Sequence, residues 1–189
     1  TQVETFDDGT LSGVWVDSAA FGGDPGSVVL AKGVCAFHKT GTAPGHTRGV
    51  AMFSPDADHR IPAPWSVEYA VPDASDLVND GGCLINRFWK SGAAVFDWVY
   101  IANAGGQIRI GVPGATAPMY SFDAAATKLL KVRFDVSVSG LKVYATTNIG
   151  SYGTGASVKW QSDVAADTPI GLCIMAGDDS GPPVAGPFD

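Results

Sequence analysis

Several side chains in the middle of the sequence have the chemistry and spacing of a ligand-binding surface. Trp98 and Tyr100 alternate with aliphatic residues, so both rings point to the same side of an extended strand. Arg109 lies in the segment that returns after a turn, and Arg87 and Trp89 lie in the preceding segment. Aromatic rings stack on the apolar face of a sugar, and planar polar side chains bind its hydroxyl groups. These five residues predict a carbohydrate-binding platform.

The aromatic residues of this segment also have a second interpretation. Large aromatic side chains dominate the interior of sandwich folds, so Phe96, Trp98 and Tyr100 could instead form core. The core interpretation is favoured for Phe96, and both interpretations stay open for Trp98 and Tyr100. Asn86 could extend a platform with its amide group.

Acidic residues near the two ends of the chain predict a possible calcium site. Asp7 and Asp8 lie near the start, and Asp178 and Asp179 lie near the end. Calcium binds six to eight oxygen atoms, which Asp-rich and Gly-rich loops supply. The alternative is ordinary turn chemistry, because Asp favours turns through its own hydrogen bonds. No cofactor is required by the sequence.

The residue pattern does not favour catalysis. Glu4 and Glu68 are the two glutamates, and neither has a second carboxylate two or four residues away on a predicted strand face. A glycoside hydrolase needs two carboxyl groups that face one sugar. The Asp178–Ser180 segment resembles a serine-protease nucleophile loop, but Pro182 and the few residues that follow do not fit that fold. The histidines have no metal-binding spacing. We expect a protein that is not an enzyme.

Composition excludes several classes of partner. The 189-residue chain has 12 Lys and Arg against 19 Asp and Glu, a formal net charge of −7, which opposes binding to nucleic acid. No apolar run approaches the roughly 20 residues that span a bilayer. The three cysteines, Cys35, Cys83 and Cys173, are too few for a paired zinc site and are expected as small buried residues, with one disulfide as the alternative.

Alternation of apolar and polar residues predicts an all-β domain. Residues 130–138 alternate strictly, and a turn at Ser139-Gly140 predicts a hairpin over 128–147. A second hairpin is predicted over 95–112, and the one helical candidate is Asp123–Leu130. Further strands are expected at Ser27–Ala31, Val34–His38, Thr47–Phe53, Trp65–Val71, Cys83–Lys90, Val158–Asp163 and Ile170–Ala176. This pattern predicts an antiparallel two-sheet β-sandwich over residues 1–181, a jelly roll, followed by a terminal stub or linker at 182–189.

The order of strands and aromatic residues resembles concanavalin A-like (laminin G-like) jelly rolls. The resemblance rests on Phe6–Trp15, Trp65–Val71, the late hairpin with Val158-Lys159-Trp160, and Ile170–Leu172 as a closing strand beside the first. Similar domains occur in bacteriophage tail and surface proteins and in carbohydrate-binding modules. The resemblance implies a lectin-like adhesion domain on a virion surface or outside the cell.

Two other functions stay open beside adhesion. The chain could be a structural virion domain that binds other tail proteins or copies of itself, or a polysaccharide-degrading enzyme built on aspartates. The adhesion hypothesis expects a bacterial surface polysaccharide or another glycan as partner. It depends on Trp98, Tyr100, Arg87 and Arg109.

Overall fold

The described part of the chain is built from antiparallel β-strands. The computed structural model describes residues 10–11, 13–17, 26–31, 34–39, 46–54, 56–72, 82–91 and 93–178, and for some strand residues, among them 93–97 and 176–178, it describes the backbone alone. These residues form fourteen strands and no helix. No segment of them is therefore a long apolar helix of the kind that crosses a membrane.

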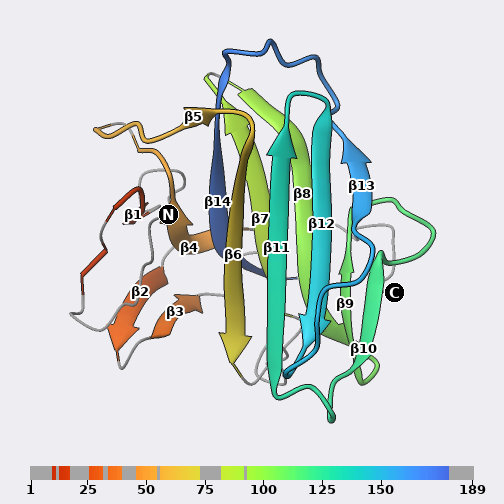
Figure 1. Cartoon of the computed structure of the whole chain (residues 1–189). Helices are drawn as coiled ribbons and strands as arrows, with labels where there is room; N and C mark the ends of the chain where they lie inside the picture. Colours follow the sequence, from red (N-terminus) through yellow and green to blue (C-terminus); the bar gives the residue numbers. More distant parts are fainter. Residues whose placement is uncertain are drawn as a thin grey trace.

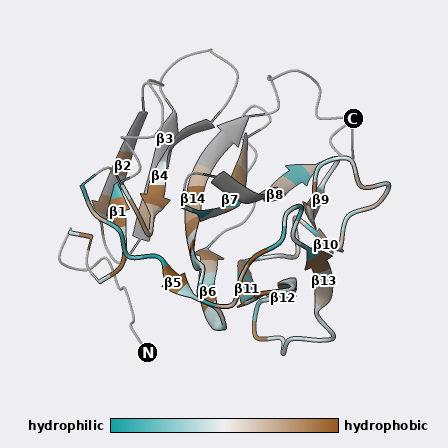
Figure 2. Ribbon diagram, turned by 90° about the horizontal axis from the view of Figure 1, so that it is seen from above, coloured by the Kyte–Doolittle hydropathy of each residue, from teal (hydrophilic) through white to brown (hydrophobic). Residues whose placement is uncertain are grey.

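The strands form two main sheets that pack face to face (Figures 1 and 2). The larger sheet has the order β1-β4-β14-β7-β8-β9-β10, with β5 paired to β14. Its strands are β1 (Val16–Asp17), β4 (His46–Ala51), β5 (Ile61–Pro62), β7 (Gly82–Lys90), β8 (Ala93–Ala104), β9 (Gln107–Gly111), β10 (Tyr120–Asp123) and β14 (Pro169–Asp178). The smaller sheet has the order β13-β12-β11-β6, from β6 (Trp65–Pro72), β11 (Leu129–Ser137), β12 (Gly140–Thr147) and β13 (Ala156–Lys159). A separate hairpin joins β2 (Gly26–Ala31) to β3 (Val34–Lys39).

The smaller sheet confirms the strongest pattern in the sequence. In β11 every second residue is buried, and Leu130, Val132 and Phe134 are fully so. β11 pairs with β12 from Leu130↔Thr147 to Ser137↔Gly140, which is the predicted hairpin. A strand with one buried face needs this period of two, so the alternation fixes which side faces the larger sheet.

The main core lies between the two sheets and is centred on Phe88 of β7. The Phe88 ring is fully buried and contacts three aromatic rings of the smaller sheet and its flanks, with centroid distances of 5.4 Å to Phe134, 5.8 Å to Trp160 and 6.4 Å to Trp65. Both tryptophans also donate a hydrogen bond from Nε1, Trp65 to the Ile61 carbonyl and Trp160 to the Ser137 carbonyl. Each aromatic side chain buried here contributes about 1.5–3 kcal/mol. This packing establishes a β-sandwich.

The structure corrects several details of the predicted elements. Residues 124–126 form a turn after β10 rather than a helix, because the Asp123 side chain and backbone carbonyl bind Ala126 and Thr127 locally. Strands β1, β5 and β10 were not expected, and β13 begins and ends earlier than the predicted 158–163. Strand β14 lies between β4 and β7, and β1 pairs with β4, so the closing strand is not beside the first described strand.

Two regions with predicted roles lie outside the description. The terminal stub at 182–189 and the opening residues Phe6–Asp8 are not among the described residues. Cys35, Cys83 and Cys173 form no disulfide, and Cys83 and Cys173 are buried as expected.

Candidate functional site

The five predicted ligand-binding residues lie on one face of the larger sheet, the side turned away from the smaller sheet. We call it the outer face. In β7, Arg87 and Trp89 lie on either side of Phe88, whose side chain is in the main core. In β9, Arg109 lies between Ile108 and Ile110, which are both fully buried in that core. Because successive side chains of a strand point to opposite faces, Arg87, Trp89 and Arg109 share the outer face.

Trp98 lies on the outer face through the ordinary alternation of β8. Its neighbour Val99 is fully buried in the main core, and Tyr100 points to the outer side. The pairing of β7 with β8 is irregular just before this point: between the pairs Asn86↔Val99 and Phe88↔Phe96, strand β8 has one residue more than β7, and a second shift follows between Phe88 and Trp89. Trp98 packs on the outer face, where its ring centroid is 6.1 Å from that of Tyr100 at an angle of 65°.

Tyr100 is on the predicted face but is not an exposed platform. Its side chain has no exposed surface, because it belongs to a second apolar cluster on the outer face that includes Ile85, Cys173 and Met175. Burial raises the pKa of Tyr100 to about 12, although the nearby charge of Arg109 acts in the opposite direction. Tyr100 therefore supports the platform from below, and the expectation of an open Tyr100 ring is corrected. Trp89 and Trp98 lie at the border of this cluster and are partly exposed.

Two aromatic rings, those of Trp89 and the buried Phe53, lie in a row between the guanidinium groups of Arg87 and Arg60. The Arg87 Cζ atom lies 4.8 Å from the centroid of the Trp89 ring. The Trp89 ring is 6.3 Å from that of Phe53, and the Arg60 Cζ atom lies 4.9 Å from the Phe53 ring. Gly171 of β14 makes room for the row, because a Cβ atom there would overlap the Arg60 side chain and press on Phe53.

Sequence reasoning missed Phe53 and Arg60. Phe53 follows β4, and Arg60 belongs to a Pro- and Asp-containing segment between two predicted strands. That segment carries no periodic pattern; Phe53 contacts Trp89 and Arg60 lies over Phe53. The unusual Gly171 within an apolar strand was the available signal, since a glycine inside a strand often marks a close approach.

Arg87 has an unsatisfied hydrogen-bond donor. Its Nε atom is buried and has no acceptor in the described part of the chain. The guanidinium group donates through Nε and both Nη atoms and is charged at every physiological pH. A buried donor without an acceptor costs about 1–3 kcal/mol.

Asn86 does not extend the platform. It alternates with Arg87, so its side chain points into the sandwich, where it is fully buried. The Tyr69 hydroxyl of β6 donates to Asn86 Oδ1 at 2.7 Å, and Asn86 Nδ2 donates to the Val99 carbonyl at 3.2 Å. Burial raises the pKa of Tyr69 well above its usual range, against the smaller opposite effect of its bond to Asn86. Asn86 is a structural link between the two sheets.

The predicted calcium ligands lie outside the description. Asp7, Asp8 and Asp179 are not among the described residues, and only the backbone of Asp178 is described, at the end of β14. The described residues contain no group of three or more His, Cys, Asp or Glu that could hold a metal ion. The calcium site stays a prediction.

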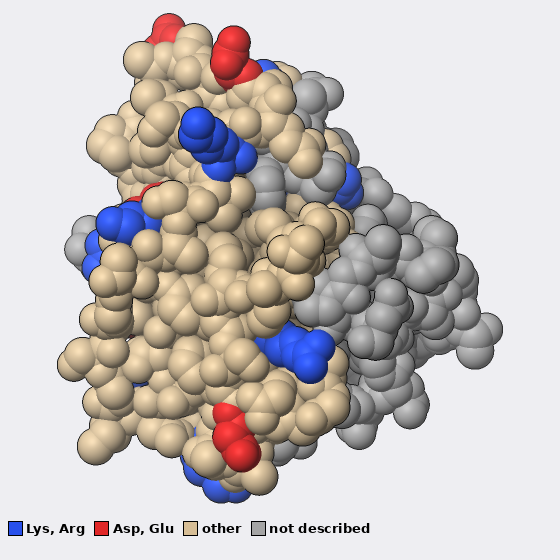
Figure 3. Space-filling model, turned by 90° about the vertical axis from the view of Figure 1, so that its right-hand side faces the viewer, with Lys and Arg blue, Asp and Glu red and all other residues tan. Residues whose placement is uncertain are grey.

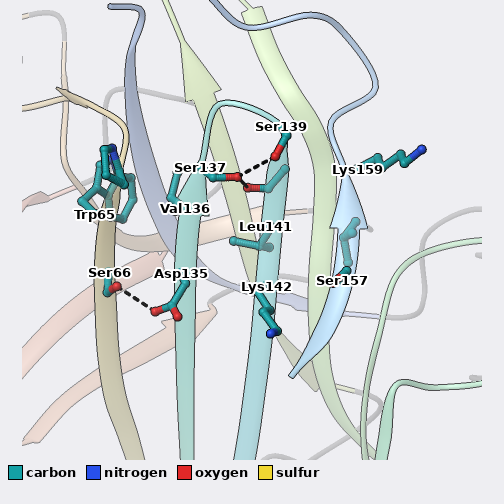
Figure 4. A pocket seen from close by; sticks show the side chains of 13 residues that line it. Trp65, Ser66, Asp135, Val136, Ser137, Ser139, Leu141, Lys142, Ser157 and Lys159 are labelled. Atoms are coloured by element: carbon teal, nitrogen blue, oxygen red, sulfur yellow. Dashed lines mark hydrogen bonds between the residues drawn. The ribbon is translucent and has the colours of Figure 1, made fainter. Parts of the chain in front are cut away.

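The smaller sheet carries a polar hollow of about 660 Å³ on the side turned away from the larger sheet (Figure 4). Ser66, Asp135, Lys142 and Ser157 form one row across its four strands. Ser66 Oγ and Arg133 Nε each donate to Asp135 Oδ1 at 2.7 Å. Burial alone would raise the pKa of Asp135, but these hydrogen bonds hold it below its usual value. Ser66, Arg133 and Asp135 thus satisfy one another.

Charged side chains are sparse on the side of the molecule shown in Figure 3. The described Lys, Arg, Asp and Glu residues stand apart on this surface and form no basic patch.

Comparisons with known proteins add no relative. The chain matches no model of a protein family, no curated protein and no solved structure. The likeness to concanavalin A-like domains therefore depends on the strand pattern and the aromatic residues of this sequence.

Proposed function

We propose that this chain is a non-catalytic glycan-binding module that uses the outer face of the larger sheet. One observation carries the proposal: Arg87 stacks on Trp89, and the rings of Trp89 and Trp98 are partly exposed on the same face of the sheet. A sugar ring stacks on an indole through its C–H groups, and its hydroxyl oxygens accept hydrogen bonds from a guanidinium group. Arg109 lies on the same face and would enlarge the polar border of the site.

The biological setting follows the resemblance given by the sequence. A concanavalin A-like jelly roll with partly exposed aromatic rings on one sheet suits a bacteriophage tail protein, or another surface-displayed protein, that recognises a polysaccharide of the host surface. The β-sandwich is the scaffold that such a site needs, because three neighbouring strands hold Arg87, Trp98 and Arg109 at fixed spacing.

A hydrolytic role is less well supported by the described carboxyl groups. A glycosidase needs an acid whose pKa is raised near a second carboxylate. Asp135, which lies in the polar hollow, has a lowered pKa because Ser66 and Arg133 donate to it. A carboxylate held in this ionised form is a poor proton donor.

The proposal is tested by binding of the wild-type chain to a glycan array and to candidate host cells. Trp98→Ala should weaken binding at least about tenfold, because removal of a stacking residue at the centre of a site costs more than about 1 kcal/mol. Tyr144→Ala is the matched control, since Tyr144 is a partly exposed aromatic residue on the smaller sheet. It should bind like the wild type.

Two outcomes would contradict the proposal. If the wild-type chain binds no glycan and no cell surface, the structural role in a virion becomes the better hypothesis. If Trp98→Ala binds as well as the wild type, the site lies elsewhere on the chain.

A further inference from the structure

The smaller sheet turns one side away from the larger sheet, which we call the front face, and every residue of its four strands is described. The register gives one row across these strands, from Ser66 through Asp135 and Lys142 to Ser157. Asp135 and Lys142 stand directly opposite each other at the centre of this row, on β11 and β12. All four residues line the polar hollow of Figure 4. A carboxylate and an ammonium group therefore lie on neighbouring strands in the middle of the face.

The charges of the front face are divided unequally between its two halves. Lys142 is exposed, its Nζ lies 5.6 Å from the centroid of the Tyr144 ring, and it forms no ion pair with a carboxylate in the described part of the chain. The half made of β12 and β13 has cations and no carboxylate, whereas the half made of β6 and β11 has both carboxylates of the face. The charged residues are Lys142 and Lys159 on the first half, and Glu68, Asp135, Lys131 and Arg133 on the second. Each half can therefore pair with the other half of an identical face.

The two halves of the front face also differ in height. The segment between β12 and β13 lies on the sheet, because a Cβ atom at Gly150 would overlap the Thr146 hydroxyl and one at Gly155 would overlap the Tyr144 ring. Thr146 is buried under this segment, whereas Ala70, two strands away in the same row, is exposed. The face is thus raised over β12 and low over β6 and β11. The raised half of one copy can fit against the low half of another.

We propose that two copies of this chain associate front face to front face, about a twofold axis that runs between β11 and β12 and parallel to them. In such an isologous contact every pair of residues occurs twice. The axis places Asp135 of each copy opposite Lys142 of the other, at the polar hollow, and the raised half of each copy against the low half of the other. This inference does not rest on the proposed function, because the glycan-binding residues lie on the opposite side of the sandwich.

The size of the front face indicates a weak dimer. β6 and β12 have eight residues each, and four strands about 4.8 Å apart with a rise of about 3.3 Å per residue give roughly 500 Å² per copy. The total of roughly 1,000 Å² is at the lower limit for a specific interface. The net charge of −7 on each copy opposes association, but at physiological ionic strength exposed charges more than about 8 Å apart are largely screened.

The experiment measures the association of the full chain by analytical ultracentrifugation at physiological ionic strength. The wild type should shift from a monomer of 19.5 kDa toward a dimer as its concentration rises. Asp135→Lys and Lys142→Asp each bring like charges together twice, so each variant alone should dimerise at least about tenfold more weakly than the wild type. An equimolar mixture of the two variants should form a heterodimer, because each contact then joins an ammonium group to a carboxylate.

Lys159→Asp is the matched control, because it makes the same change of charge on the neighbouring strand β13, where the axis brings no described carboxylate opposite. It should dimerise like the wild type. A wild type that stays monomeric at every concentration would overturn this inference and leave the glycan-binding function in place. Variants whose mixture associates no better than either variant alone would also overturn it. If Asp135→Lys does not fold, Lys142→Asp at its exposed position still decides, since dimerisation equal to that of the wild type would contradict the arrangement.

Discussion

The hydrogen bond between Tyr69 and Asn86 gives the sharpest test of how the two sheets are held together. Tyr69 belongs to β6 of the smaller sheet and Asn86 to β7 of the larger one, and the hydroxyl donates to Oδ1 at 2.7 Å. Tyr69→Phe removes this donor but keeps the ring, whose centroid is 6.2 Å from that of Phe134. The change therefore isolates the hydrogen bond from the packing.

The expected cost follows from the burial of Asn86. Its side chain has no exposed surface, so water cannot replace the lost donor at Oδ1. An unsatisfied buried acceptor costs about 1–3 kcal/mol. For a domain of this size each kcal/mol lowers the melting temperature by about 2–4 °C.

The assay is urea unfolding followed by tryptophan fluorescence, in a cycle of Tyr69→Phe, Asn86→Leu and the double variant. In the Asn86→Leu background the Tyr69 hydroxyl has lost its acceptor, so Tyr69→Phe should cost nothing there or even stabilise the chain. Glycan binding by Tyr69→Phe below its transition should equal that of the wild type. A Tyr69→Phe variant within about 0.5 kcal/mol of the wild type, or equal effects in both backgrounds, would refute the reasoning.

Two further predictions concern the strands beneath the outer face. Gly49→Ala should destabilise the chain by at least about 2 kcal/mol in urea unfolding, because a Cβ atom there overlaps the Ile174 carbonyl oxygen of β14. An unchanged midpoint of the urea transition would show that β4 and β14 are not packed this closely. Burial raises the pKa of the Cys173 thiol to about 12, so the unfolded chain loses this proton first and stability falls as pH rises above about 9. Between pH 9 and pH 11 the free energy of unfolding should fall by about 2–3 kcal/mol less in Cys173→Ala than in the wild type. Equal losses in the two proteins would contradict the burial of the thiol.

Most of the sandwich could be predicted because its strands have one buried face. The alternation in 129–147 sets both the strands and the register of the β11–β12 hairpin, and it marks Leu130, Val132 and Phe134 as core. The short strands β1 and β5 could not be predicted, since two residues carry no period. The run of alanines after Asp123 suggested a helix, but local bonds from Asp123 make a turn instead.

The sequence predicted which side of the larger sheet carries the candidate residues, but not how exposed their side chains are. Alternation correctly placed Arg87, Trp89 and Arg109 opposite the main core. It gave no sign of the second apolar cluster that buries Tyr100, because a sheet covered on both sides shows apolar residues on both. The two irregularities in the pairing of β7 with β8 also have no signature in the residues.

The most direct test of the proposed function is the response of the five tryptophan indole N–H signals in a two-dimensional NMR spectrum as glycan is added. Trp65 and Trp160 donate these protons to backbone carbonyls at the edge of the main core, so they serve as internal controls. The outer-face site predicts that the signals of Trp89 and Trp98 shift with saturation while those of Trp65 and Trp160 stay in place. Shifts at Trp65 or Trp160 with none at Trp89 and Trp98 would place the ligand elsewhere and contradict the proposal.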